Sequence, residues 1–109
     1  MKKIYLACPF SDLDKSVQEN RFEAANRKAA EFMDWGHIVF SPISHSVPIN
    51  KYLSPKDLNF WLRQDLPMLE MCDELWVLAL PGWVDSEGVR AEMEHAKIHK
   101  IPVRILHAY

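Results

Sequence analysis

Six consecutive apolar residues, Leu75–Leu80, are followed at once by the turn-forming pair Pro81-Gly82. A short apolar run that ends at turn residues is typical of a strand covered on both faces, as the inner strands of parallel sheets are. No longer apolar run occurs in the chain, and a membrane span needs about 20 such residues. The run predicts an inner strand of a parallel sheet, and we expect no membrane-spanning segment.

The other segments alternate between strand and helix character. Strand patterns cover Lys3–Ala7, His37–Phe40 and Val103–Leu106, and helical periodicity covers residues 16–35, a stretch from Ser54 towards Met71, and Ser86–Lys100. Residues 41–54 contain two prolines and no periodicity, so we expect a long loop there. The order βαβαβαβ predicts an α/β fold: a doubly wound, flavodoxin- or Rossmann-like parallel sheet of four to five strands flanked by helices. We expect residues 1–109 to form a single domain.

Two helix starts are predicted from capping patterns. Ser16-Val17-Gln18-Glu19 has the form of a capping box, and in Ser54-Pro55-Lys56-Asp57 the serine caps while the proline takes the first helical position. Pro67 is expected to kink or break the second of these helices.

Charge and cysteine content narrow the classes of partner. Lysine and arginine number 13 against 15 acidic residues, a formal net charge of −2. Without a basic excess or a polybasic segment, we expect neither a nucleic-acid polymer nor a membrane surface as partner. Cys8 and Cys72 are far apart and lack metal-type spacing, which favours a cytoplasmic protein without disulfides. A small-molecule ligand fits best.

Asp65 interrupts the apolar face of the second predicted helix. Leu58, Leu62 and Leu69 lie four, seven or eleven residues from one another along one face, and Asp65 falls in the middle of it. An ionised carboxylate on a buried face costs several kcal/mol unless it is paired, so we expect Asp65 to be protonated or to meet a partner. Alternatively, Pro67 turns it outwards or it caps a following short helix.

Glu92 lies at the edge of the apolar face of the third predicted helix. Gly88, four residues earlier, would let a ligand approach closely. Ser86 is expected to cap this helix, leaving free amides where anions bind. Spacing alone, however, favours the description of Glu92 as one of several solvated helix carboxylates.

His95 and His99 are four residues apart, which raises a metal hypothesis with Glu92 as third ligand. The order ExxHxxxH is not that of the zinc motif HExxH, so we expect two surface histidines and no metal. We expect Cys8 to be a structural thiol rather than a nucleophile.

Tyr5, Asp65 and the segment Ser86-Glu87-Gly88-Val89-Arg90-Ala91-Glu92 together resemble the nucleoside 2-deoxyribosyltransferase superfamily. The form Ser-x-Gly-Val-x-x-Glu is most similar to its 2′-deoxynucleoside 5′-phosphate N-hydrolase branch. Other stretches, Tyr5–Pro9, Phe40–Ile43 and Leu80–Trp83, look more like short bacterial and phage relatives of that family.

The resemblance implies roles for individual residues. Glu92 matches the nucleophile that attacks C1′ of the sugar, Asp65 the carboxyl group that helps protonate the leaving base, and Tyr5 the tyrosine that orients the nucleophile. Ser86 stands where transferases carry an acid, and a serine there suits a 5′-phosphate. Ser11 lies in the loop that touches phosphate in the hydrolases. We expect Glu92 to be ionised and Asp65, with a raised pKa, to be protonated.

The remaining candidates have a structural alternative beside each role. Phe10 or Trp83 stacks on the base, or belongs to the core. His45 covers the site or donates to a ligand, or only caps a turn. Arg90 stands where the hydrolase branch has a small residue. It is either only a difference from that branch or a contributor to the phosphate site. Cys8-Pro9 replaces a glycine-containing loop and reshapes the phosphate end.

The sequence therefore predicts an N-glycosidase that hydrolyses a (2′-deoxy)nucleoside 5′-monophosphate without a cofactor. The alternatives are base exchange by a nucleoside 2-deoxyribosyltransferase and a non-catalytic module that senses nucleotides. The chain is shorter than typical transferases, whose C-terminal region completes a neighbour's site, so we expect hydrolysis. The resemblance also implies a homodimer or a larger homo-oligomer.

Overall fold

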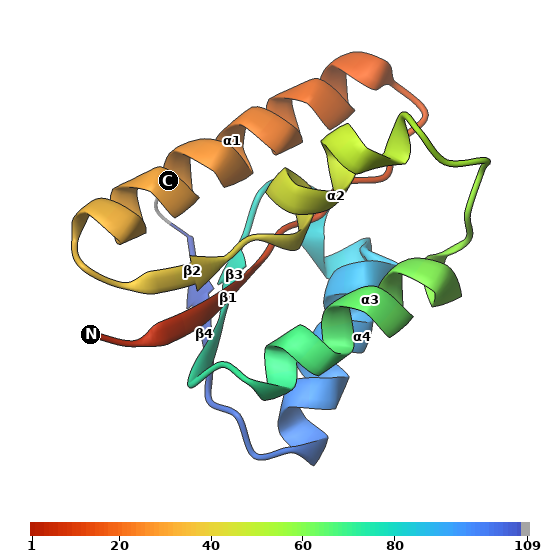
Figure 1. Ribbon diagram of the computed structural model, residues 1–109. Coiled ribbons are helices and arrows are strands. Elements are labelled where there is room, and N and C mark those ends of the chain that lie inside the picture. The colour runs from red at the N-terminus through yellow and green to blue at the C-terminus, as the bar shows by residue number, and fades with distance from the viewer. Residues whose placement is uncertain (108–109) are drawn as a thin grey trace.

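The computed structural model describes residues 1–107 and contains one four-stranded parallel sheet among them (Figure 1). The strands are β1 (Lys3–Ala7), β2 (Ile38–Phe40), β3 (Glu74–Leu78) and β4 (Val103–Leu106), in the order β2-β1-β3-β4. The helices are α1 (Lys15–Asp34), α2 (Pro42–Asn50), α3 (Leu58–Glu70) and α4 (Glu87–Ile98), with a short 3-10 helix η1 at Trp83–Asp85. The predicted α/β, doubly wound parallel fold is confirmed, with the smaller of the two expected strand numbers.

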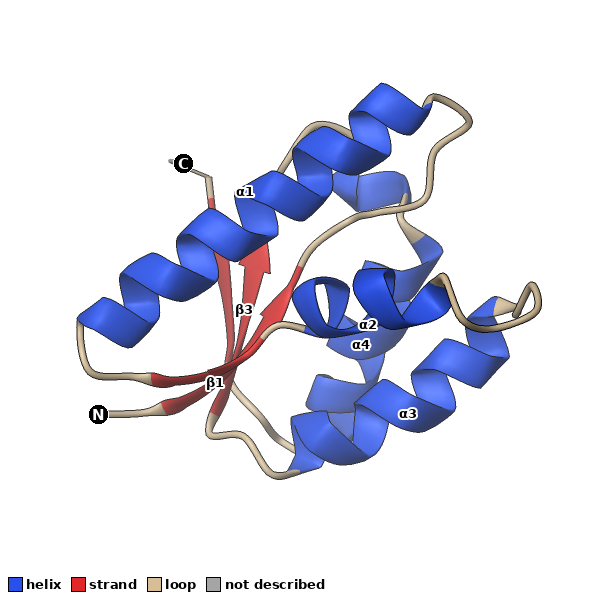
Figure 2. Cartoon of the chain, turned by 45° about the horizontal axis from the view of Figure 1, so that its top comes forward, coloured by secondary structure: helices blue, strands red, loops and turns tan. Residues whose placement is uncertain are grey.

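The two faces of the sheet are covered by different helices (Figure 2). Helix α1 packs on one face, and α3 and α4 pack on the other. Helix α2 lies beyond the carboxyl ends of the strands, between α1 and α3, in both views (Figures 1 and 2). Because the connections from β1 and β3 leave to opposite faces, a crevice is expected between these two strand ends, where ligands bind in such folds.

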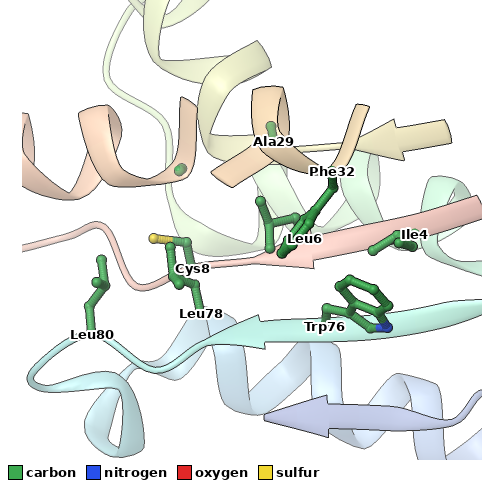
Figure 3. Packing of buried hydrophobic residues seen from close by; sticks show 9 residues of the cluster. Ile4, Leu6, Cys8, Ala29, Phe32, Trp76, Leu78 and Leu80 are labelled. Carbon is green, nitrogen blue, oxygen red and sulfur yellow. The ribbon is translucent and has the colours of Figure 1, made fainter. Parts of the chain in front are cut away.

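Alternation along the strands builds a core on each face. Ile4 and Leu6 of β1 face α1, whereas Tyr5 and Ala7 face α3 and α4. Figure 3 shows the α1 side, where the Phe32 ring meets the Trp76 ring of β3 edge-on, with 4.9 Å between centroids. The predicted inner strand, β3, is buried on both faces as expected, because it lies between β1 and β4.

The predictions for three segments need correction, and the first two segments differ at their helix starts. The carboxylate of Asp14, not the hydroxyl of Ser16, caps α1 by accepting from the Ser16 backbone N–H. Asp57, not Ser54, caps α3 by accepting from the Phe60 backbone N–H at 2.9 Å. In both segments an ionised aspartate near the start is a better acceptor than serine. Pro67 does not end α3, because the helix continues to Glu70.

The third correction concerns residues 41–54, which are not all loop. Residues 42–50 form α2, with Pro42 in the first turn, where its missing N–H is not needed. The His45 backbone N–H donates to the Ser41 carbonyl at 3.1 Å and closes that turn. Pro48 lies inside this helix. The helix is too short and too weakly amphipathic for periodicity to have indicated it. Over residues 1–107, none of the helices combines the length and apolarity that a bilayer crossing requires.

Candidate active site

A pocket of about 990 Å³ opens at the carboxyl ends of β1 and β3. The loop after β1, the helix α2, the outer part of α3 and the first turns of α4 form its walls. These segments are far apart in the sequence and meet at the crevice that the doubly wound topology creates. We therefore expect the predicted site residues to line this pocket.

Two buried carboxyl groups line this pocket from adjacent helices. Asp65 of α3 is 9% exposed and Glu92 of α4 is 6% exposed. The alternative in which Pro67 turns Asp65 towards solvent is therefore wrong, as is the description of Glu92 as a solvated helix carboxylate. Each acid lies on or beside the apolar face of its own helix, and the packing of α3 on α4 brings these two faces together.

Tyr5 contacts Glu92 from the core side of the pocket wall. Its side chain is fully buried in the core between the sheet and α4, and its hydroxyl donates a hydrogen bond to Glu92 Oε2. Burial raises the pKa of Tyr5 well above its usual range, and the charge of Glu92 adds to the rise. Tyr5 is therefore a fixed hydrogen-bond donor that sets the orientation of the Glu92 carboxyl group.

Burial raises the pKa of both carboxyl groups. It raises the pKa of Glu92 to about 8, against the opposing hydrogen bond from Tyr5, and the charge of Asp65 raises it further. It raises the pKa of Asp65 to about 6, while the charge of His45 acts against the rise. At neutral pH the pair therefore shares one proton. For Glu92, burial opposes the ionised state that the sequence predicts.

This burial predicts a pH dependence of stability. A carboxyl group whose pKa is raised in the fold makes the protein less stable as pH increases from its ordinary value, 4.5, to its folded value, about 8. For Glu92 the loss is on the order of 4 kcal/mol. Glu92→Gln keeps an acceptor for Tyr5 but cannot ionise, so at pH 9 we expect it to be more stable than the wild type, with similar stability near pH 4.5. Denaturant unfolding at several pH values measures the difference.

The matched control for that comparison is Glu94→Gln. Glu94 is exposed on the same helix, so its unfolding free energy should follow the wild type at every pH. A Glu92→Gln variant that stays parallel to the wild type from pH 4.5 to pH 9 would contradict the burial argument.

Ser86 and Gly88 lie where the sequence predicted them, at the start of α4 in the pocket wall. The Ser86 hydroxyl accepts from the Val89 backbone N–H at 3.2 Å and so caps the helix. A Cβ placed on Gly88 would meet only ordinary contacts, the nearest being Leu58 Cδ1 at 3.8 Å. Packing therefore does not require a glycine here, and the absence of a side chain at this position leaves the pocket more open.

Phe10 and Ser11 also line the pocket, and Arg21 fixes their loop. The Arg21 guanidinium donates to the carbonyls of Phe10 and Ser11 after β1, and to that of Pro81 after β3 at 2.9 Å. It thus ties together the two loops that flank the crevice. Sequence reasoning missed Arg21. This residue lies four positions before the buried Ala25 of α1, just as Asp65 lies four positions before the buried Leu69 of α3.

Trp83, Arg90 and His45 are not among the residues that line the pocket. Trp83 and Arg90 border a second cavity of about 610 Å³ beside α4 and β4, and Arg90 donates to the Val84 carbonyl at 3.2 Å. Arg90 is two residues from Glu92, and a helix turns about 200° over that distance. His45 packs against the Phe40 ring, near enough to Asp65 to affect its pKa.

Ser46 of α2 is a pocket residue that the sequence did not indicate. Its hydroxyl is buried and has no hydrogen-bond partner among residues 1–107. An unpartnered buried hydroxyl is costly, and one in a pocket wall is ready to bond a ligand. Sequence reasoning missed it because α2 itself was not predicted.

Lys15, Lys51 and Lys56 add three positive charges to the pocket lining. They come from α1 and from the segment between α2 and α3, which gather only in the folded chain. Cys8 lies in the wall too, and burial raises the pKa of its thiol to about 12. It therefore carries no thiolate at neutral pH.

The metal hypothesis of the sequence also changes. Among residues 1–107, the carboxylate grouped with His95 and His99 is that of Glu70, the last residue of α3, and not that of Glu92. This cluster is separate from the residues that line the pocket.

Comparisons with known proteins agree with the fold. The family model described as "Domain of unknown function (DUF1937)" matches residues 2–108. No curated protein matches the chain. Among solved structures, a 2-deoxyribosyltransferase from the psychrotolerant bacterium Bacillus psychrosaccharolyticus, described as a biocatalyst for the synthesis of nucleosides, is similar with a TM-score of 0.70. It is 26% identical, over 94% of this chain and 70% of that one.

Proposed function

The chain belongs to the DUF1937 family, and we propose that it is an N-glycosidase that hydrolyses the base–sugar bond of a (2′-deoxy)nucleoside 5′-monophosphate. The observation that carries the proposal is the pair of buried carboxyl groups, Asp65 and Glu92, in the wall of one pocket. Cleavage of a glycosidic bond with retention uses two such groups, one as nucleophile and one as acid. The similarity to a 2-deoxyribosyltransferase supports the same bond as the target.

The proposed reaction has two steps. Glu92 attacks C1′ of the sugar, the bond from C1′ to the base nitrogen breaks, and Asp65 gives its proton to the departing base. A covalent glycosyl ester of Glu92 remains. Water then attacks C1′, Asp65 takes a proton from it, and the ester bond breaks to free the sugar phosphate and Glu92.

The shared proton of the pair must be on Asp65 for the first step. The reactive form is therefore the singly protonated pair with its proton on Asp65. Bound substrate favours this arrangement in two ways. Its base accepts a hydrogen bond from the protonated Asp65, and the partial positive charge at C1′ stabilises the ionised Glu92. Tyr5 keeps its hydrogen bond to Glu92 and steadies the carboxylate as it forms.

The polar groups of the pocket support a phosphorylated substrate. Lys15, Lys51 and Lys56 supply positive charge in the lining, and Ser46 supplies a free hydroxyl. Asp85 and Glu87 flank Ser86, so the start of α4 is a less favourable anion site than its free amides alone would make it. We therefore assign the phosphate to the lysine-lined part of the pocket.

Base exchange is the second candidate, and the similarity to a 2-deoxyribosyltransferase favours it. In that reaction the glycosyl ester of Glu92 would be opened by the nitrogen of a second base instead of by water. The first step and the two carboxyl groups are the same, so the reactions differ only in the group that attacks C1′ second.

A panel of substrates separates these functions. The protein is incubated with 2′-deoxynucleoside 5′-monophosphates, their ribose counterparts and the nucleosides without phosphate, and free base is measured by liquid chromatography. Release from a monophosphate in water alone supports hydrolysis. Release that requires a second base supports exchange, a preference for unphosphorylated nucleosides contradicts the phosphate assignment, and saturable binding without any product indicates a sensing module.

A further inference from the structure

Two histidines of α4 converge on one carboxylate of α3 at the end of these helices remote from the pocket. Glu70 is the last residue of α3, and His95 and His99 lie in the last turns of α4. The pocket uses only earlier residues of both helices, such as Asp65 and Glu92. Both helices connect parallel strands on the same face of the sheet and so run in the same direction, which puts this cluster and the pocket at opposite ends of the helix pair.

The geometry of the cluster is that of three ligands around one point. Glu70 Oε2 lies 2.7 Å from His95 Nε2 and 3.8 Å from His99 Nε2. One ligand atom from each residue lies within 4.8 Å of the others. The two imidazole rings are adjacent, with 4.3 Å between centroids. A hydrogen bond explains the position of His95, but His99 is too far from the carboxylate for one.

A metal ion would hold the three ligand atoms at one spacing. Zinc binds imidazole nitrogen and carboxylate oxygen at about 2.1 Å, which places tetrahedral ligands about 3.4 Å apart. Glu70 Oε2 lies 2.7 Å and 3.8 Å from the two imidazole nitrogens, so shifts of less than about 1 Å in these side chains bring both pairs to that spacing. We propose that Glu70, His95 and His99 form a binding site for one divalent transition-metal ion of the zinc type. The sequence predicts two surface histidines without a metal, with Glu92 considered as the third ligand, and the proposal differs by taking the third ligand from α3.

The donor set selects the class of ion. Two imidazoles and one carboxylate suit zinc, nickel and copper, whereas magnesium prefers oxygen ligands. The His99 and Glu70 side chains are 42% and 44% exposed, so water can complete the coordination. The cluster also lies where both helices end, and a cation there meets the negative ends of the two helix dipoles.

An ion at this site would join the ends of α3 and α4. The same two helices carry Asp65, five residues before Glu70, and Glu92, three residues before His95. The ion would therefore stabilise the helix pairing that forms the pocket wall while lying outside the residues that line the pocket. Because it binds the folded chain and not the separated helices, it raises the melting temperature as its concentration increases. The site stands on its own geometry and does not depend on the proposed glycosidase function.

The test uses the full chain without a histidine tag, after treatment with a chelator. Zinc chloride is titrated in a calorimeter, and the melting temperature is recorded with and without zinc. We expect one ion per chain, and at about ten times the Kd a rise in melting temperature of about 6 °C. Magnesium chloride should give neither signal.

Variants locate the ion. His99→Ala and Glu70→Gln should each weaken zinc binding by at least about tenfold and remove the thermal shift, while His107→Ala, which removes an exposed histidine elsewhere, should bind as the wild type does. Circular dichroism checks that each variant is folded; the two affected side chains are exposed, and if one variant does not fold the other decides. Absence of binding at millimolar zinc, an equal response to magnesium, or undiminished binding in His99→Ala or Glu70→Gln would overturn the site.

Discussion

Glu92→Gln should lose release of the base almost completely, with a fall in kcat on the order of 10⁴-fold or more, while substrate binding changes little. The amide has nearly the shape of the carboxylate and can still accept the hydrogen bond from Tyr5. It cannot form the glycosyl ester on which both proposed steps depend. Liquid chromatography of free base gives kcat for the monophosphate that the substrate panel identifies, and calorimetry gives its Kd.

Glu94→Gln is the control for this activity measurement as it is for stability. It removes one negative charge from the same helix at an exposed position, so kcat should remain within about twofold of the wild type. A Glu92→Gln protein that keeps most of its activity would refute Glu92 as nucleophile, whatever the substrate.

The same substitution is expected to stabilise the protein above pH 8, where the wild type must bury a charge. Stability gained and activity lost in a single change indicate a group kept for its chemistry rather than for the fold. A structural carboxyl group of the same burial would show a stability effect alone, so the two measurements together separate the roles.

The arrangement of the fold was predictable because each main element has a strong local signal. The apolar run Leu75–Leu80 indicates the inner strand β3, and the heptad-like spacing of Leu58, Leu62 and Leu69 indicates α3. Asp65 was found by the same logic, since a carboxyl group within an apolar face needs a reason to be there. The structure supplies that reason in the pocket.

Other features depend on contacts between distant segments and leave no local signal. Helix α2 is short and contains two prolines, so it forms where the chain packs beyond the strand ends and not because of its own periodicity. Ser46 becomes a buried hydroxyl only through that helix. The carboxylate that meets His95 and His99 comes from another helix, Glu70 on α3, and no spacing within α4 reveals it.

Protonation is a third property that a sequence pattern does not determine. The sequence places Glu92 near the start of a helix, where the dipole favours a negative charge. In the folded chain burial raises the pKa of Glu92, against the hydrogen bond from Tyr5. The pKa of each carboxyl group thus depends on its depth in the tertiary structure.

Asp65→Asn should lower kcat by about 10²- to 10⁴-fold, the usual contribution of a general acid. It should also change the pH profile. In the wild type the pair holds one proton between about pH 6 and about pH 8, so kcat/KM is expected to follow a bell between those values. Asparagine has no proton to lose, so the basic limb should disappear. The acidic limb that remains should follow the ionisation of Glu92 alone and lie below pH 8, because the charge of Asp65 no longer adds to the rise that burial causes in the pKa of Glu92.

A substrate whose base leaves without protonation tests the role of Asp65 directly. A nucleotide with an N7-methylated purine carries its positive charge already, so Asp65→Asn should cleave it at nearly the wild-type rate. Asp34→Asn, at an exposed position at the end of α1, should leave both the rate and the bell unchanged. If Asp65→Asn keeps the basic limb, or loses as much activity on the methylated substrate as on the ordinary one, Asp65 acts by shaping the pocket and the proton comes from another group.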